Sequence, residues 1–222
     1  MHLLLIGEIM PKPPFEQLSN RKKRAIYKTC LELFAQHGYA NTSLKMINKR
    51  LRVADGYLYY YFNGKEDIAQ WAIEIGLAKW KEDYQDNVAK QRPTDLFSLY
   101  KLSIIQMARF VRENPELFGA YVLLANEPEF PLAGWMNQQA NWIDESYEQT
   151  IRQDIAAGKL RNDIPPAMIA MVLAVINTRV QELVFKPTLD LTGISSLSDE
   201  NLEAMVGKIV SIIERGLSLD GQ

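Results

Sequence analysis

Three tyrosines near the end of the N-terminal third of the chain are well placed to contact another molecule. On the wheel of a short predicted helix, Tyr57, Tyr60 and Tyr61 fall within one arc. Their hydroxyls can bond phosphates or base edges, and their rings can touch thymine methyl groups. The alternative is an aromatic core, but Leu58 and Phe62, at i and i+4, already suffice to anchor so short a helix. The tyrosines therefore predict a surface that contacts nucleic acid.

Four consecutive basic residues, 21–24, open an earlier predicted helix. The helix dipole disfavours positive charge at an N-terminus, so we expect another partner to compensate these residues. Phosphate groups would do so, and DNA binding would then depend steeply on salt. A solvated basic arm is the alternative interpretation.

Charge divides the chain into two parts. Residues 11–66 carry eleven Lys and Arg against four Asp and Glu, a net charge of +7. From residue 67 onward, 14 basic residues face 22 acidic ones, a net charge of −8. A basic part joined to an acidic part indicates a polyanionic partner for the first part only, although a solvated surface would also carry such charges.

The chain contains few residues of the types that commonly serve in catalysis or metal binding. It has two histidines, His2 and His37, and one cysteine, Cys30, with no Gly-rich phosphate loop and no metal-spaced His/Cys set. We therefore predict no catalytic residue, no metal site and no cofactor. His37 is interpreted as a helix C-terminal residue and Cys30 as a buried packing residue. One cysteine excludes an intrachain disulfide, and the short apolar start is not a convincing signal peptide, so we expect a cytoplasmic protein.

Three short helices are predicted to position the tyrosines. The first spans about 20–37, capped by Ser19 or Asn20 and ended by Gly38. The second is capped by Thr42 or Ser43, and the third covers about 54–61. Three helices with tight connections are typical of a helix-turn-helix unit.

The remainder is also predicted to be helical, which gives an all-α protein of about nine helices with no sheet. A long fourth helix, to about residue 88, links the two parts. The further helices are expected near 94–113, 115–126, 133–157, 165–186 and 199–217. The predicted organisation is a disordered leader (1–18), a helix-turn-helix domain (19–66) and a larger domain (67–222).

The stretch from Ala25 to Asp67 closely resembles the DNA-binding domain of the tetracycline-repressor (TetR) family. The matching residues are Leu33-Phe34, Gly38, Thr42-Ser43, Ile47, Val53, Gly56, Leu58-Tyr59, Tyr61-Phe62 and Lys65-Glu66. Two residues depart from the family pattern: Arg52 stands in place of the usual turn glycine, and Ala54 in place of the usual serine cap.

The resemblance implies a DNA-binding transcriptional regulator, and roles for particular residues. Contacts to an operator carry over to Thr42, Ser43, Lys45, Gly56, Tyr57, Tyr59, Tyr60 and Lys65. Lys65 is expected to hold a phosphate together with free backbone N–H groups at the start of the fourth helix. Asp55 either accepts from a cytosine amine or simply favours a helix N-terminus.

The larger domain is expected, from the resemblance, to dimerise through the helices near 165–186 and 199–217 and to bind a small-molecule effector. Aromatic and Met side chains of the middle helices are candidates for lining that site, with an ordinary core as the alternative. The candidates are Tyr84, Tyr100, Met107, Phe110, Phe118, Trp135 and Trp142. Arg109 and Arg112 could attract an anionic ligand, or be solvated surface residues.

Three functions remain open from the sequence. The first is a homodimeric repressor released from a palindromic operator by a ligand, or an activator built the same way. The second is an enzyme, against which the missing catalytic residues argue. The third is an architectural DNA-binding dimer without a ligand.

Overall fold

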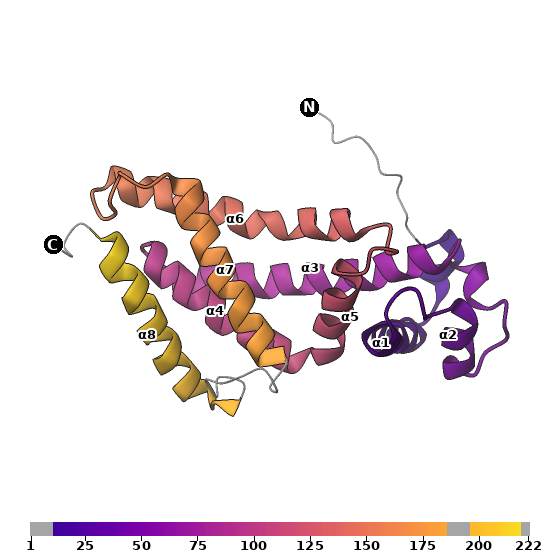
Figure 1. The fold of residues 1–222 in the computed structure, drawn as a ribbon. Helices are drawn as coiled ribbons and strands as arrows, with labels where there is room; N and C mark the ends of the chain where they lie inside the picture. Colours follow the sequence, from indigo (N-terminus) through magenta and orange to yellow (C-terminus); the bar gives the residue numbers. More distant parts are fainter. Residues whose placement is uncertain (1–10, 186–195, 219–222) are drawn as a thin grey trace. The chain divides into compact units, whose positions relative to one another are not determined.

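The computed structural model of the chain describes residues 11–185 and 196–218, except for the side chains of residues 133, 135–145 and 185. The described residues form eight α-helices and two 3-10 helices, η1 and η2, and no strand (Figure 1). In chain order they are η1 (Pro13–Gln17), α1 (Asn20–His37), α2 (Leu44–Leu51), η2 (Leu58–Tyr60), α3 (Lys65–Gln91), α4 (Leu96–Glu113), α5 (Pro115–Ala125), α6 (Ala133–Ala156), α7 (Pro166–Phe185) and α8 (Asp199–Leu217). The all-α prediction is confirmed.

The first two helices begin and end where their capping residues require. Of the two proposed caps of α1, Ser19 accepts from the Lys22 N–H at 3.4 Å. Ser43 caps α2, accepting from the Met46 N–H at 3.2 Å. Gly38 ends α1 with φ of 72°, a left-handed value that a residue without Cβ adopts at little cost.

The predicted third helix over 54–61 is not an α-helix. Turns over residues 55–57 lead into the single 3-10 turn η2, held by hydrogen bonds from Tyr60 N–H to the Tyr57 carbonyl and from Tyr61 N–H to the Leu58 carbonyl. Ala54 has no side-chain oxygen to cap a helix, and Gly56 lowers helix propensity. The pattern of apolar residues is kept, because Leu58 and Phe62 are both buried.

Arg52 ends α2 in the left-handed region, with φ of 58° and ψ of 44°. The turn thus requires a left-handed backbone at this position, which glycine adopts more easily than arginine. The Arg52 N–H donates to the carbonyls of Asn48 and Lys49, so the turn still satisfies the last carbonyls of α2.

We expect Arg52→Gly to raise the free energy of unfolding by about 0.5–1 kcal/mol. Left-handed backbone costs an L-residue with a Cβ roughly 1–2 kcal/mol, and the greater freedom of glycine in the unfolded chain offsets about half of that. Urea denaturation of the two proteins measures the difference. Lys49→Gly, placed in the helical backbone of α2, is the control and should lower stability by about 1 kcal/mol. Equal losses in both variants would contradict the prediction.

The chain is already ordered before α1, which corrects the prediction that residues 1–18 form a disordered leader. From residue 11 onward the backbone is described, and η1 follows at Pro13. Its Phe15 side chain is buried against Phe62 and Trp71, with ring centroids 5.2 and 5.0 Å away. Residues 1–10 lie outside the described part of the chain.

Two compact units make up the chain: residues 1–79 with 115–139, and residues 80–114 with 140–222. We call these unit 1 and unit 2. Unit 1 takes in α5 because that helix packs along α1 (Figure 1). Leu117 of α5 also packs against Gly76 of α3, where an added Cβ would lie 2.3 Å from a Leu117 methyl group. The structure therefore groups residues differently from the predicted boundary at 66/67.

Unit 2 is built around α4, which packs against both α7 and α8. The Tyr100 hydroxyl donates to the Leu173 carbonyl at 2.9 Å. Two arginines of α4 hold the start of α8: Arg109 binds Asp199 and Glu203 at 2.9 and 2.8 Å, and Arg112 binds Asp199 at 3.3 Å. Both arginines thus have carboxylate partners within the unit.

Asp154 connects α6 to the start of α4 in unit 2. Its buried carboxylate accepts from the Leu96 N–H at 2.7 Å and lies 3.3 Å from the Lys159 ammonium. Asp95 caps the same helix end through a reciprocal bond with Ser98. Burial raises the pKa of Asp95, but hydrogen bonds from Ser98 and Thr94 and the charge of Lys159 outweigh it and leave that pKa lowered.

One helix segment, Pro166–Val184, is long and apolar enough to cross a membrane by length and composition. Core helices of soluble proteins meet the same criteria. In α7 the apolar residues lie on more than one side: Leu173 and Val180 are buried, whereas Met171 and Val175 are exposed.

Candidate nucleic-acid interface

The predicted interface includes a pair of neighbouring exposed tyrosines on η2. Tyr59 is 55% exposed and Tyr60 is 62% exposed, while Leu58 before them is fully buried. Tyr57 is half-buried and Tyr61 is buried. Of the three tyrosines predicted to share one arc, Tyr60 alone is exposed, although the rings of Tyr57 and Tyr60 both contact the Tyr61 ring.

The buried Tyr61 ring packs against the rings of Tyr57 and Tyr60. Its centroid lies 5.2 Å from that of Tyr57 and 5.1 Å from that of Tyr60, both in edge-on contact. Partial burial raises the pKa of Tyr57, and a hydrogen bond and charge interaction with Tyr61 raise it further. The Tyr57 hydroxyl therefore stays protonated and able to donate at neutral pH.

Thr42 and Ser43, the two hydroxyl residues predicted to bind DNA, differ in exposure. Ser43 is exposed and caps α2. Thr42 is only 1% exposed, and its hydroxyl donates to the Gly38 carbonyl at 2.6 Å. Its placement argues against the predicted DNA contact of Thr42, because its side chain joins the end of α1 to the start of α2 instead.

Lys45 and Gly56 lie on open surface near η2. Lys45 is exposed, and its ammonium lies 4.0 Å from the exposed carboxylate of Asp55. A Cβ added to Gly56 would meet nothing within 4 Å, so the backbone there is accessible. Asp55 faces Lys45 and has no α-helix to start, which removes the expected helix-dipole role.

The Lys65 ammonium binds another part of the same unit, the turn at Tyr39. This ammonium donates to the Tyr39 carbonyl at 2.6 Å and lies 3.9 Å from the centroid of the Tyr39 ring. These contacts leave Lys65 fixing the turn between α1 and α2, in place of the phosphate contact that the sequence predicted.

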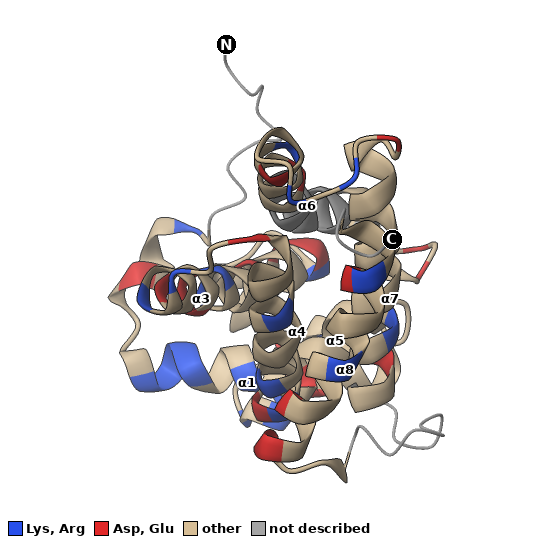
Figure 2. Ribbon diagram, turned by 90° about the vertical axis from the view of Figure 1, so that its left-hand side faces the viewer, with Lys and Arg blue, Asp and Glu red and all other residues tan. Residues whose placement is uncertain are grey.

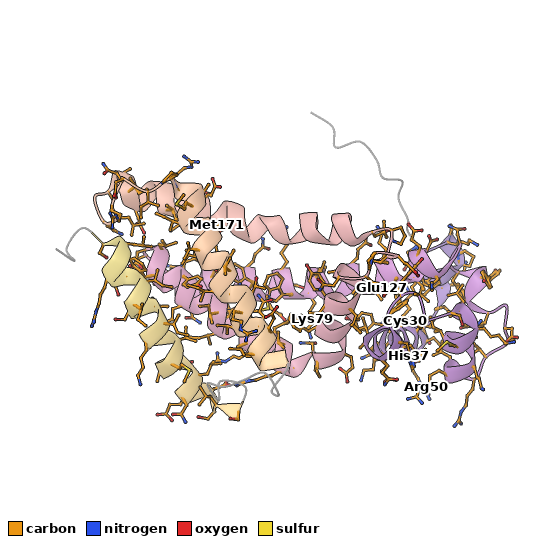
Figure 3. All side chains as sticks on the ribbon, viewed as in Figure 1. Cys30, His37, Arg50, Lys79, Glu127 and Met171 are labelled. Carbon is orange, nitrogen blue, oxygen red and sulfur yellow. The ribbon has the colours of Figure 1, made fainter. Side chains whose placement is uncertain are left out.

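Glu127, which follows α5 in unit 1, holds the opposite side of the same turn (labelled in Figure 3). Its carboxylate accepts from the N–H groups of Tyr39 and Ala40, both at 2.5 Å. Glu127 thus binds the backbone N–H groups of Tyr39 and Ala40, and Lys65 binds the Tyr39 carbonyl. The role of Glu127 could not be predicted from the sequence, because this residue comes 88 residues after Tyr39 and no local pattern marks it.

Positive charge gathers on the two α-helices that precede the tyrosines in sequence, α1 and α2. Figure 2 shows in blue the basic residues of α1, of which Arg21, Lys22, Arg24 and Lys28 are exposed. On and after α2, Lys45, Lys49, Arg50 and Arg52 are exposed as well. Arg50 lies 3.3 Å from Glu32 and Lys45 lies 4.0 Å from Asp55, while the rest of this set is available to an anionic partner such as phosphate.

The predicted effector-binding residues are divided between the units. Tyr84, Tyr100 and Met107 are buried in unit 2, and Phe110 of the same unit is half-buried, 6.3 Å from the Trp80 ring. Phe118 is buried in unit 1. Trp135 and Trp142 lie outside the residues whose side chains the structure describes.

Two polar side chains in unit 2 were not identified from the sequence. The Asn177 oxygen on α7 and the Gln106 amide nitrogen on α4 are buried and make no hydrogen bond. A polar group buried without a partner is unfavourable by about 1–3 kcal/mol. Asn177 could have been singled out in the sequence as a lone amide within the apolar run of α7.

Known regulatory proteins resemble this chain over stretches of different length. The sequence model of "Bacterial regulatory proteins, tetR family" matches residues 26–70. YuxN of Bacillus subtilis, an uncharacterized HTH-type transcriptional regulator, is 44% identical over 47 residues, which cover 21% of this chain and 16% of YuxN. The chain therefore spans less than a fifth of that relative's length. The HTH-type transcriptional repressor AcnR of Corynebacterium efficiens is 19% identical over 161 residues, 69% of this chain and 77% of AcnR.

Solved structures share the fold over nearly the whole chain. A TetR family transcriptional regulator from Chloroflexus aurantiacus has a TM-score of 0.76 and 24% identity, covering 94% of this chain and 99% of that one. The regulator FadR of Bacillus subtilis, solved with stearoyl-CoA, has a TM-score of 0.67 and 17% identity, covering 86% and 97%. These matched proteins are transcriptional regulators, not enzymes, as the sequence predicted.

Proposed function

We propose that this chain, which belongs to the tetR family of bacterial regulatory proteins, is a DNA-binding homodimeric repressor that a small-molecule effector releases from a palindromic operator. The observation that carries the proposal is the exposed pair Tyr59 and Tyr60, on a turn anchored by buried neighbours in a unit whose α1 and α2 carry exposed basic residues. Two large aromatic rings exposed together indicate a surface that another molecule covers.

In this proposal the tyrosine pair reads the major groove. The Tyr59 and Tyr60 hydroxyls reach base edges or phosphates, and their rings contact thymine methyl groups. Ser43, Lys45, Gly56 and Tyr57 complete the set, with the serine and lysine on phosphates and the glycine allowing close approach of the backbone. The exposed basic residues of α1 then neutralise flanking phosphates.

Dimerisation would use the exposed apolar side of α7 together with α8. Met168, Met171, Val172 and Val175 are all exposed and recur at i, i+3, i+4 and i+7, which places them in one stripe (Met171 is labelled in Figure 3). Ile212 of α8 is 74% exposed. A second copy related by a two-fold axis would bury this stripe. To read successive major grooves, the two turns of such a dimer would need to lie about 34–36 Å apart, one turn of the double helix.

Effector binding is assigned to unit 2, around α4 and α7. Candidate residues there are the buried Tyr84, Tyr100 and Met107, the half-buried Phe110, and the unpartnered amides of Gln106 and Asn177. An apolar surface with a few polar groups suits an amphipathic small molecule, the kind of ligand solved with FadR. Release follows if the effector binds the conformation with lower DNA affinity more tightly. These steps take place in the cytoplasm, where the DNA is.

The test is binding of the purified protein to the DNA upstream of its own gene, measured by fluorescence anisotropy across a salt series. We expect tight binding of two chains per palindrome, with the logarithm of the affinity falling linearly as the logarithm of salt rises. An Arg21→Gln, Arg24→Gln variant should have a shallower slope, by about 0.9 for each phosphate that it no longer neutralises. Absence of salt-dependent binding to every upstream fragment would contradict the proposal.

A further inference from the structure

We infer that Lys12–Gln17, which we call the N-terminal strap, positions the tyrosine pair for reading DNA. The inference rests on the proposed function, and its structural basis is a set of contacts within unit 1. The Lys12 N–H donates to the Tyr61 carbonyl at 2.8 Å, and the Lys12 ammonium donates to the Tyr59 carbonyl at 3.0 Å. One residue of the strap thus holds the backbone on both sides of Tyr60.

The tyrosine turn needs such support because it is so short. η2 contains three residues, and a single turn is far below the length at which a helix is stable by itself. The last carbonyls of any helix also lack partners within that helix. Lys12 donates a hydrogen bond to two carbonyls of this turn, those of Tyr59 and Tyr61. The next element of the chain, α3, begins only at Lys65.

Phe15 attaches the strap to the core of unit 1. Its side chain is 1% exposed, and its ring meets Tyr61, Phe62 and Trp71 edge-on, with centroid distances of 5.9, 5.2 and 5.0 Å. Tyr61 and Phe62 directly follow η2, so the buried ring packs on the end of the reading turn. Such edge-to-face pairs add about 0.5–1.5 kcal/mol each beyond the area that they bury.

The strap is also held from α1 and stiffened by its own sequence. Lys23 lies 5.3 Å above the Phe15 ring and binds the Glu16 carboxylate at 2.6 Å. Pro13 and Pro14 have fixed φ angles, which reduces the entropy lost when the strap is ordered. The strap is therefore a stiff element with a buried anchor at Phe15 and two hydrogen bonds from Lys12.

This arrangement bears on specificity more than on general affinity. Non-specific binding comes almost wholly from phosphate neutralisation, which the basic residues of α1 and α2 supply without the strap. Discrimination between bases requires the Tyr59 and Tyr60 side chains to be held in one position. Loosening the strap should therefore lower operator affinity while non-specific affinity stays the same.

Three full-length variants separate the contacts of Lys12. Lys12→Pro removes only the N–H donor and the ammonium, because the φ of −54° at this position suits proline. Lys12→Met removes the ammonium and keeps the N–H. Lys12→Arg keeps both and is the conservative control.

The first measurement needs no DNA. We expect the backbone order parameter of the Tyr60 amide, observed by NMR on protein labelled with 15N-tyrosine, to fall from about 0.85 to below about 0.6 in Lys12→Pro and to be unchanged in Lys12→Arg. The tyrosine amides of unit 2, such as that of Tyr100, report whether the fold is intact. An unchanged order parameter of Tyr60 in Lys12→Pro overturns the inference, whatever the protein binds.

The second measurement compares operator with random DNA at one salt concentration and across a salt series. Lys12→Pro and Lys12→Met should lose about five- to tenfold in operator affinity, with unchanged affinity for random DNA and an unchanged salt slope. Equal loss on both DNAs with a slope lower by about 0.9 would make Lys12 a phosphate contact and overturn the positioning role. Failure of the wild type to prefer any operator would count against the proposed function, while the NMR result still decides the role of the strap.

Discussion

A Tyr59→Ala, Tyr60→Ala variant is expected to bind its operator about 100-fold more weakly than the wild type, with only a small loss of stability. Each direct contact to a base is worth about 1–3 kcal/mol, so two modest contacts together correspond to two orders of magnitude in affinity. Both side chains are more than half exposed, so the loss of stability comes mainly from the edge-to-face contact of Tyr60 with Tyr61, worth about 0.5–1.5 kcal/mol. Fluorescence anisotropy on operator DNA and urea denaturation give the two quantities.

The matched control is the double Tyr→Phe variant at the same positions. It keeps both rings and removes both hydroxyls, so it separates hydrogen bonding from ring contacts. A loss shared by the two variants would assign the recognition to the hydroxyls, and a loss in the alanine variant alone would assign it to the rings. Operator affinity that is unaffected by the alanine variant would show that the tyrosines do not contact DNA.

Asp154→Ala is expected to give the largest loss of stability, about 3 kcal/mol. The substitution leaves the Leu96 N–H of α4 without its acceptor and removes the partner of Lys159. Removing one member of a buried pair costs about 3–5 kcal/mol, and the exposure of Lys159 to water places this case at the lower end. Urea denaturation measures the change, and faster hydrogen exchange of the Leu96 amide locates it at the start of α4.

Two controls accompany this substitution. Asp154→Asn keeps an oxygen acceptor for the Leu96 N–H and should lose about 1 kcal/mol. Asp163→Ala removes an exposed carboxylate whose partner is Arg161, and should leave the denaturation midpoint unchanged. A stable Asp154→Ala protein with slow exchange at Leu96 would mean that the hydrogen bond to Asp154 does not hold α4.

The elements that could be predicted from the sequence are those whose signals are local. Ser43 and Gly38 mark helix ends because they bond or bend the backbone within a few residues. The burial of Leu58 and Phe62 also followed from their spacing, even though the residues between them form a 3-10 turn.

What could not be predicted depends on contacts between distant parts of the chain. Phe15 lies in a proline-rich stretch without helical periodicity, and its burial depends on Trp71, which comes more than fifty residues later. Lys65 matched a family pattern for phosphate contact, but its geometry is set by the Tyr39 carbonyl. Glu127 gained its role from α5 packing on α1, which no spacing in either helix reveals.

The division of unit 1 into two separate stretches of chain has a consequence during synthesis. The N-terminal stretch, residues 1–79, leaves the ribosome well before Glu127, which must close the turn at Tyr39 and Ala40. At roughly 5–20 residues per second, several seconds pass while α1 has no α5 to cover it. The nascent helices that face nucleic acid thus complete their fold only after the middle of the chain has been translated. A polypeptide released prematurely after residue 79 would lack that cover and expose the apolar side of α1 to chaperones and proteases.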